Sequence, residues 1–301
     1  MMYGLLSQLS TRVALRPALY CRSTRRDQQR NQHRRLWAAL VFVAAHGLAM
    51  AANEPGPATP AAAAPAESSA PHGVNGDLGL YSDYIARGLS YSRERFSLQG
   101  HFEYDFPQGP YLGSYLIHNS AIVNKETVEI DPFVGYLRRF NDWTIDANVF
   151  FWLYPHSRLD ASRNRYNTVE ATTDVTYKTF GVKVWYDLKN YFGLDSGSAW
   201  VDYKLQPHGP SRGSFYIDSH LNLPLRNGLL LRLHAGHQFI RHYGELDYTD
   251  WLIGLEKTLG HNVTAGAAYT QTDGNAELYA DPHGLNLARG KWLAYLRWSF
   301  P

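Results

Sequence analysis

The sequence contains very little cysteine: Cys21 is the only one in 301 residues. A single thiol cannot form a disulfide within the chain, so packing and hydrogen bonds must hold the fold together. Long apolar runs are almost as scarce, because residues 36–51 form the only one. The remainder of the chain therefore has no segment that resembles a membrane-spanning helix, which needs about 20 apolar residues.

A strong net charge is also absent, since the chain has 29 basic and 27 acidic residues. Residues 1–51 hold eight of those basic residues and a single acid, Asp27. Without this segment, 21 basic and 26 acidic residues remain, a formal charge of −5. The basic isoelectric point thus belongs to the N-terminal segment, and we expect no nucleic-acid partner.

Residues 1–51 are predicted to be a presequence that contains a signal peptide. Two arginines precede its apolar region, residues 36–51, and Ala49-Met50-Ala51 offers an A-x-A cleavage site. The arginine-rich start is typical of an organellar transit peptide or of a start codon placed too far upstream, and the complete bacterial-type signal favours the second. Residues 52–73 are rich in Pro and Ala, which predicts a flexible periplasmic tail.

From residue 74 onward, apolar and polar side chains alternate with a period of two. In residues 214–224, Ile217 and Leu221 share one face while Asp218 and His220 share the other. About 12 segments repeat this pattern: 77–88, 95–106, 110–119, 127–139, 143–154, 167–178, 181–191, 214–224, 228–241, 248–259, 262–272 and 289–300. We therefore predict an all-β fold, a transmembrane antiparallel up-and-down β-barrel over residues 74–301 in the outer membrane. A soluble β-sandwich would explain the alternation but not the signal peptide.

The connections between these segments alternate between long and short. The long ones are 89–94, 120–126, 155–166, 192–213, 242–247 and 273–288. Bacterial barrels have short periplasmic turns, long extracellular loops and an even number of strands, which matches this order. Residues 199–205 also alternate, but a thirteenth strand would reverse every later turn. We therefore expect a hairpin arm there, within the long loop 192–213.

Aromatic residues occur at both ends of several segments, for example Trp292 and Phe300 on the last one. Rings with a polar edge favour the interface between lipid and water, so their abundance fits two girdles around a barrel.

Three stretches resemble the TorF-type porin family of Gram-negative outer-membrane barrels. Residues 81–90 resemble its S-D-Y-x-x-R-G-x-S motif, residues 248–255 its Y-T-D-W-x-x-G strand, and residues 267–273 its A-Y-T-x-T-D stretch. The order and spacing fit residues 74–301. The chain departs from the pattern in an expanded loop 192–213 and in ending on Phe300-Pro301. The resemblance implies a barrel and a pore, and it implies no particular substrate.

Strand alternation also predicts which side chains face the barrel interior. The predicted lumen residues are Asp83, Arg87, His101, Glu103, Asp105, Glu129, Asp131, Asp146, Glu170, Asp174, Lys183, Asp187, Lys189, Asp218, His220, Arg232, His234, Glu256 and Arg297. Two interpretations remain open. They form cross-strand ion pairs that fill a narrow barrel, or they line a water-filled channel.

The predicted function is that of a porin for passive diffusion of small hydrophilic solutes or ions. The expected partners are outer-membrane lipid, the barrel-assembly machinery and small solutes or cations; no cofactor is expected, and the sequence leaves the oligomeric state open. A ligand-binding, lipid-binding or structural barrel is the alternative. An outer-membrane phospholipase is less favoured, because His118 and Ser120 form its His-x-Ser pair but no oxyanion-hole residues follow.

Overall fold

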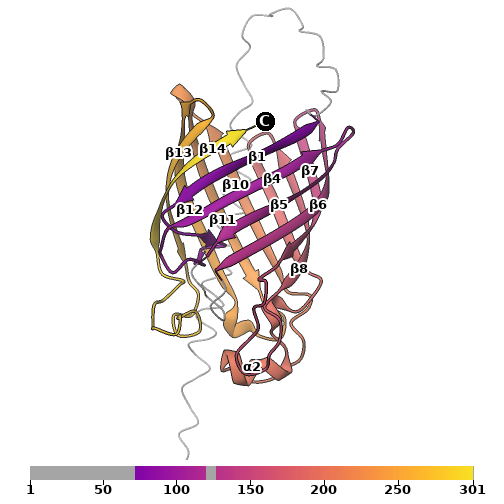
Figure 1. The fold of residues 1–301 in the computed structure, drawn as a ribbon, viewed down its shortest axis with the longest axis vertical. Helices are drawn as coiled ribbons and strands as arrows, with labels where there is room; N and C mark the ends of the chain where they lie inside the picture. The colour runs from indigo at the N-terminus through magenta and orange to yellow at the C-terminus, as the bar shows by residue number, and fades with distance from the viewer. Residues whose placement is uncertain (1–71, 120–126, 301) are drawn as a thin grey trace, which may run out of the picture. The chain divides into compact units, whose positions relative to one another are not determined.

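The computed structural model describes residues 72–119 and 127–300. Twelve long strands form one closed antiparallel barrel (Figure 1), which confirms the predicted fold. The barrel strands are β1 (Gly73–Tyr81), β4 (Ser97–Asp105), β5 (Pro110–His118), β6 (Val128–Phe140), β7 (Trp143–Trp152), β8 (Thr168–Tyr177), β9 (Phe180–Asp187), β10 (Phe215–Pro224), β11 (Leu229–Phe239), β12 (Tyr248–Gly260), β13 (Val263–Thr272) and β14 (Lys291–Phe300). Each pairs with the next along the chain, and β1 closes the ring against β14. The predicted presequence, the tail as far as residue 71 and loop 120–126 lie outside the described residues.

The short connections lie at one end of the barrel, where β14 also ends, and the long loops lie at the other (Figure 1). The turn between β10 and β11 has only four residues, 225–228. Asn227 and Gly228 have φ of 59° and 68°, a left-handed conformation that Asn and Gly adopt most readily. The alternation of loop lengths expected from the sequence is therefore present in the fold.

The outer face of the barrel is apolar. Exposed aliphatic side chains occur around the ring, among them Leu78, Leu98, Leu112, Val134, Val184, Leu255 and Leu296. Aromatic pairs flank this belt: the Trp143 and Tyr177 rings lie 4.8 Å apart at the short-turn end, and those of Trp251 and Tyr269 lie 5.4 Å apart at the loop end. A closed barrel with an apolar belt between aromatic girdles satisfies its backbone hydrogen bonds in lipid, and it is the architecture of an outer-membrane protein.

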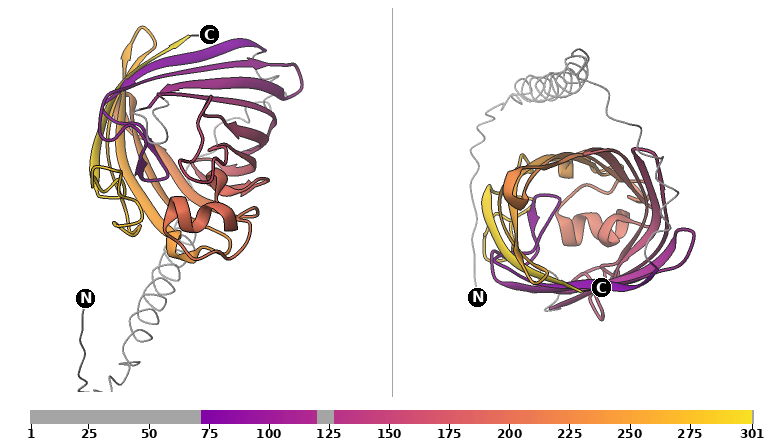
Figure 2. Two further views of the ribbon diagram at one scale, coloured as in Figure 1. Left: turned by 60° about the horizontal axis from the view of Figure 1, so that its bottom comes forward. Right: turned by 90° about the horizontal axis from the view of Figure 1, so that it is seen from above.

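Two long loops narrow the interior at the loop end. Residues 82–92, named here the inward hairpin, contain β2 (Ile85–Ala86) and β3 (Leu89–Ser90), which pair with each other and lie inside the ring (Figure 2). Residues 188–214 contain α2 (Ser196–Tyr203), which lies within the outline of the barrel when seen along its axis (Figure 2).

Two predicted elements differ from the structure. The first strand spans Gly73–Tyr81 rather than residues 77–88. It begins within the predicted tail, at Gly73, and it ends early because the chain turns inward after Tyr81. Residues 199–205 belong largely to α2 and not to a hairpin arm. Local capping decides this: the Asp195 side chain accepts hydrogen bonds from the first turn of α2, and the Ser198 hydroxyl oxygen accepts one from the backbone N–H of Asp195. No helix in the described parts of the chain has the length and apolar character needed to cross a bilayer.

Candidate functional site

The barrel interior carries most of the predicted lumen residues. Sixteen lie on the inward face of a barrel strand: His101, Glu103 and Asp105 on β4; Glu129 and Asp131 on β6; Asp146 on β7; Glu170 and Asp174 on β8; Lys183 and Asp187 on β9; Asp218 and His220 on β10; Arg232 and His234 on β11; Glu256 on β12; and Arg297 on β14. Asp83 and Arg87 also lie inside, but on the inward hairpin rather than on a strand. Lys189 is exposed beyond the end of β9, because that strand stops at Asp187. The role of the predicted lumen residues in conduction stays a prediction.

The half of the interior near the short turns is open to water. The Arg232 and Arg297 side chains face inward there and are still 47% and 29% exposed. Nearer the loops, the Glu170 side chain is 1% exposed and Asp187 is fully buried. The interior is therefore wet on the short-turn side and filled on the loop side.

The inward hairpin folds around a tight turn. Arg87 and Gly88 stand between β2 and β3 with φ of 48° and 75°, the positive values that a two-residue type I′ hairpin turn requires. Asp83 holds the two ends of the hairpin together, since its Oδ1 accepts hydrogen bonds from Ser90 and Ser92, each 2.7 Å long. These contacts all lie within the inward hairpin, so its shape does not depend on the barrel wall alone.

Two side chains anchor the inward hairpin to the wall. The Tyr84 hydroxyl donates a 2.7 Å hydrogen bond to Glu129 on β6. The Arg87 guanidinium reaches β8, where its Nη2 lies 2.8 Å and 2.7 Å from the two oxygens of Glu170. Its Nη1 donates to Gln238 on β11 at 2.9 Å. The hairpin therefore bridges the lumen, and Arg87 occupies its interior.

The three stretches that resemble the TorF-type motifs meet at this hairpin. A Cβ atom placed on Gly88 would lie 2.7 Å from Cβ of Asp250 and 2.8 Å from Cγ2 of Thr272. Gly88 belongs to the first stretch, Asp250 to the second and Thr272 to the third. Only glycine leaves room for this contact, so the three motifs describe one structural unit, the seat of the inward hairpin.

A second cluster lies around His234. Its two ring nitrogens lie 2.8 Å from an oxygen of Asp218 and 2.6 Å from an oxygen of Asp250. The Tyr216 hydroxyl also donates to Asp250, at 2.8 Å. His234 therefore links three neighbouring strands, β10, β11 and β12, below the inward hairpin.

The loops enclose a cavity of about 910 Å³ at the loop end of the barrel. Rings from four loops contribute to its wall, including Tyr91, Tyr166, Phe192 and Tyr279. The Phe192 and Tyr166 rings stack at 5.0 Å, and Phe192 is only 2% exposed. This vestibule leads to the inward hairpin, and aromatic rings form part of its wall.

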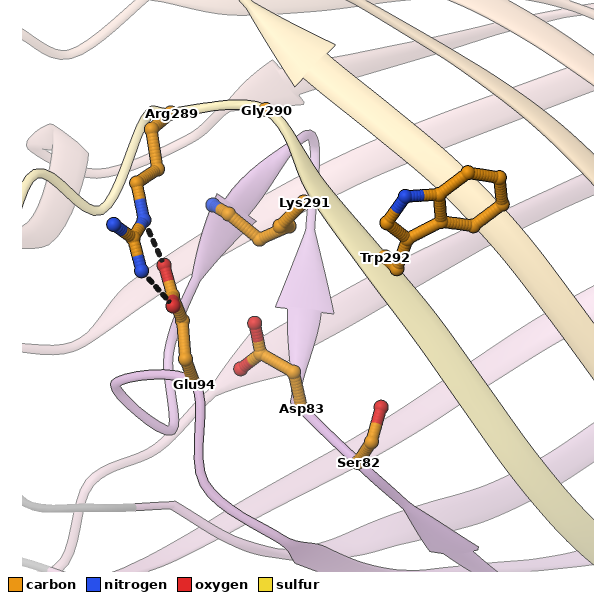
Figure 3. Close-up of a pocket in the computed structure, with 7 residues that line it drawn as sticks. All are labelled: Ser82, Asp83, Glu94, Arg289, Gly290, Lys291 and Trp292. Atoms are coloured by element: carbon orange, nitrogen blue, oxygen red, sulfur yellow. Dashed lines mark hydrogen bonds and ion pairs between the residues drawn. The ribbon is translucent and has the colours of Figure 1, made fainter.

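Ion pairs tie the hairpin's loop to residues 273–290. The Arg289 Nε lies 2.6 Å from Glu94 (Figure 3), and this hydrogen bond lowers the pKa of Glu94. Arg93 pairs with Asp281 at 2.5 Å. Burial alone would raise the pKa of Asp281, but the backbone N–H groups of Leu285 and His283 and the Arg93 guanidinium outweigh it, and the pKa is lowered. Both carboxylates are therefore held in their charged form.

A smaller cavity of about 370 Å³ lies beside the Glu94–Arg289 pair. Lys291 and Trp292 line it, and their side chains leave β14 on opposite sides (Figure 3). The Lys291 amine is buried and lies 3.4 Å from the carbonyl oxygen of Gly88. The tip of the inward hairpin is therefore held by β14 as well.

Strand alternation could have identified four further interior residues. Asp77 faces His101 at 3.6 Å. Asp250 and Lys291 are buried, and Arg139 has the inward parity of Glu129 near the short-turn rim. Each shares the parity of a predicted lumen residue on its own segment. The buried tyrosines Tyr216 and Tyr248 also have this inward parity, whereas the abundance of aromatic residues was attributed to the membrane interface.

The alternative chemistries gain no support from the geometry. His118 is exposed at the end of β5, and Ser120 lies outside the described residues. No group of three or more His, Cys, Asp or Glu in residues 72–119 and 127–300 could hold a metal ion.

Residues 65–300 match the model of a family described as bacterial protein of unknown function (Gcw_chp). That description does not mention the TorF type, so the narrower assignment stays a prediction. None of the curated protein sequences matches this chain.

The fold is similar to those of solved outer-membrane barrels. The KdgM porin has a TM-score of 0.46 at 9% identity, over 75% of this chain and 99% of that one. The NanC porin has a TM-score of 0.44 at 12% identity, over 76% and 99%. The COG4313 outer membrane channel from Pseudomonas putida F1 has a TM-score of 0.45 at 12% identity, over 79% and 100%. These similarities are remote in sequence.

Proposed function

The chain belongs to the Gcw_chp family, whose function is unknown, and we propose that it is an outer-membrane channel for small hydrophilic solutes or ions. One observation carries the proposal: water-accessible space exists on both sides of the inward hairpin. The vestibule of about 910 Å³ lies on the loop side. Exposed inward side chains such as Arg232 line the other side, and the inward hairpin lies between.

The charge of the interior supports a preference for cations. Eleven carboxylates and five Lys or Arg belong to the predicted lumen residues. The geometry adds Asp77 and Asp250 to the acids, adds Arg139 and Lys291 to the bases, and removes Lys189. Among the described residues, thirteen acids therefore face six bases. An excess of one sign in a narrow channel with low-dielectric walls concentrates the opposite ion.

A non-conducting, ligand-binding barrel is the second candidate. The observation that favours it is the filled loop half, where the inward hairpin and residues 188–214 pack with buried aromatic rings. In that case a ligand would enter the vestibule and go no further.

Planar-bilayer conductance of the refolded protein distinguishes the two. A channel gives single-channel steps in wild-type protein, and Arg87→Ala enlarges them because it removes the anchor of the hairpin. Arg297→Ala, in the wet half, serves as a control that leaves the obstruction in place. Absence of conductance in all three proteins would exclude the channel and favour the ligand-binding barrel.

A further inference from the structure

The Arg87 guanidinium lies in a cage of aromatic rings. Its Cζ lies 5.6 Å from the ring centre of Trp152, 5.1 Å from that of Trp185 and 4.8 Å from that of Tyr216. All three distances are within the ~6 Å over which a cation is attracted to a ring face. The rings come from three strands, β7, β9 and β10, so the barrel wall builds the cage without help from the hairpin.

The floor of the cage is acidic and dry. Glu170 accepts from Arg87 and also from the Trp152 indole N–H, at 2.6 Å. Asp187 is fully buried beside it, and its Oδ2 has no hydrogen-bond partner in the described structure. Its Oδ1 accepts from Thr168 at 3.1 Å. Two buried carboxylates therefore lie beside one guanidinium from the inward hairpin, and the Lys183 amine lies 4.1 Å from the centre of the Trp185 ring.

Arg87 reaches this cage from a backbone that side chains other than glycine rarely adopt, with φ of 48°. A strained backbone of this kind persists when other contacts offset its energetic cost, here the contacts of the Arg87 guanidinium. The wall thus supplies a complete cation site, and a separate loop segment supplies the cation.

We infer that this cage, named here the Arg87 cage, is a binding site for an organic monocation of the guanidinium or alkylammonium class, which Arg87 fills as an internal ligand. The inference rests on the proposed channel function, because a free cation reaches the cage only through the lumen. A weakly hydrated planar cation gains from the three rings and from Glu170, whereas a small inorganic ion keeps its water. Displacement of Arg87 by such a solute would release the hairpin and clear the lumen.

The test uses the full-length protein refolded in detergent. Arg87→Ala empties the Arg87 cage, and guanidinium chloride, kept below 50 mM and balanced against KCl, is the probe. Binding is followed by the fluorescence of the cage tryptophans. We expect a saturable change in Arg87→Ala and a much weaker apparent affinity in wild type, where Arg87 competes for the cage. Binding should be at least about tenfold weaker in Arg87→Ala/Glu170→Gln than in Arg87→Ala, because a hydrogen bond to a charged group is lost.

Arg232→Ala is the matched control. Arg232 is also an inward arginine paired with a carboxylate, Glu256, at 2.7 Å, but among the described residues its guanidinium lies over no aromatic ring face. Its removal should give no saturable guanidinium signal. If Arg87→Ala does not fold, Arg87→Gln removes the charge while keeping most of the volume, and the same titration applies.

Two failures can be told apart. A folded Arg87 variant that gives no saturable response, or that responds equally with and without Glu170, overturns the cation site. Binding of guanidinium by the variant without any conductance in bilayers overturns the channel function and leaves the cation site standing. Block of the variant's current by guanidinium, at the concentration that saturates the fluorescence, supports both.

Discussion

Gly88 lies directly against Asp250: a Cβ atom at Gly88 would come within 2.7 Å of the Asp250 Cβ. The contact brings the tip of the inward hairpin to β12, 162 residues further along the chain. It leaves no space for a larger residue, and it fixes how deeply the hairpin enters the lumen.

Gly88→Ala should therefore destabilise the protein more than a glycine replacement that meets no neighbour. Gly284 is the control, because its φ of +83° is close to the +75° of Gly88 and nothing lies within 4 Å of its added Cβ. In both variants an alanine must adopt a positive φ, which costs about 1–2 kcal/mol. Gly88→Ala should lose a further ~1–3 kcal/mol through overpacking against Asp250 and Thr272. Urea unfolding of the refolded protein measures the difference, and equal losses would show that the contact with Asp250 is relaxed.

The loop ion pairs should weaken at low pH. Glu94 and Asp281 have lowered pKa values in the folded protein, so the stability they contribute is present above their ordinary pKa values of 4.5 and 3.8 and is lost as the pH falls through the folded ones. Hydrogen exchange in residues 82–96 and 273–290 should therefore accelerate, after correction for intrinsic rates, between pH 5 and pH 3. Glu94→Gln should reduce this acceleration of exchange, because the variant has no carboxylate to protonate at position 94.

Residues 240–247 should show the opposite pH dependence, with faster hydrogen exchange as the pH rises. Burial raises the pKa of Asp247 to about 6, although the backbone N–H of Ile240 donates to it. A raised pKa of an acid means that stability is lost as the pH rises from 3.8 to about 6. Exchange in this loop should accelerate over that range, and a flat profile would mean that Asp247 is hydrated in solution.

The channel should prefer cations, and salt should blunt the preference. Reversal potentials across a KCl gradient measure it. Glu103→Gln combined with Asp174→Asn removes two carboxylates of the wet half and should reduce the ratio of cation to anion permeability. Raising the salt from 0.1 M to 1 M shortens the Debye length from about 10 Å to about 3 Å, so the ratio should approach unity. Anion preference in wild type would contradict the prediction.

The long loops should face the outside of the cell. An epitope tag after Pro207, in the exposed part of residues 188–214, should be reached by antibody on intact cells, and a tag at Asn227 should not. Labelling of both positions only after the cells are permeabilised, or the reverse pattern, would mean that the barrel is inserted differently.

The sequence alone determined the wall of the barrel. Alternation with a period of two is a local property, since successive side chains of a strand point to opposite faces. It therefore predicted twelve strands, the side of each turn and the inward face of residues such as Glu170 and His234. The local pattern was ambiguous at residues 199–205, where alternation predicts a strand and the capping residues Asp195 and Ser198 favour a helix. The structure contains the helix.

The obstruction inside the barrel was decided by tertiary structure. Residues 82–88 continue the alternation of β1, and nothing local marks Tyr81 as the end of the strand. The chain leaves the wall there because its partners lie far away in sequence: Glu129 for Tyr84, Glu170 for Arg87, and Asp250 for Gly88. Such contacts exist only when the closed barrel places β6, β8 and β12 around the same part of the lumen. A single sequence can therefore predict that these residues face inward, but not that they contact one another.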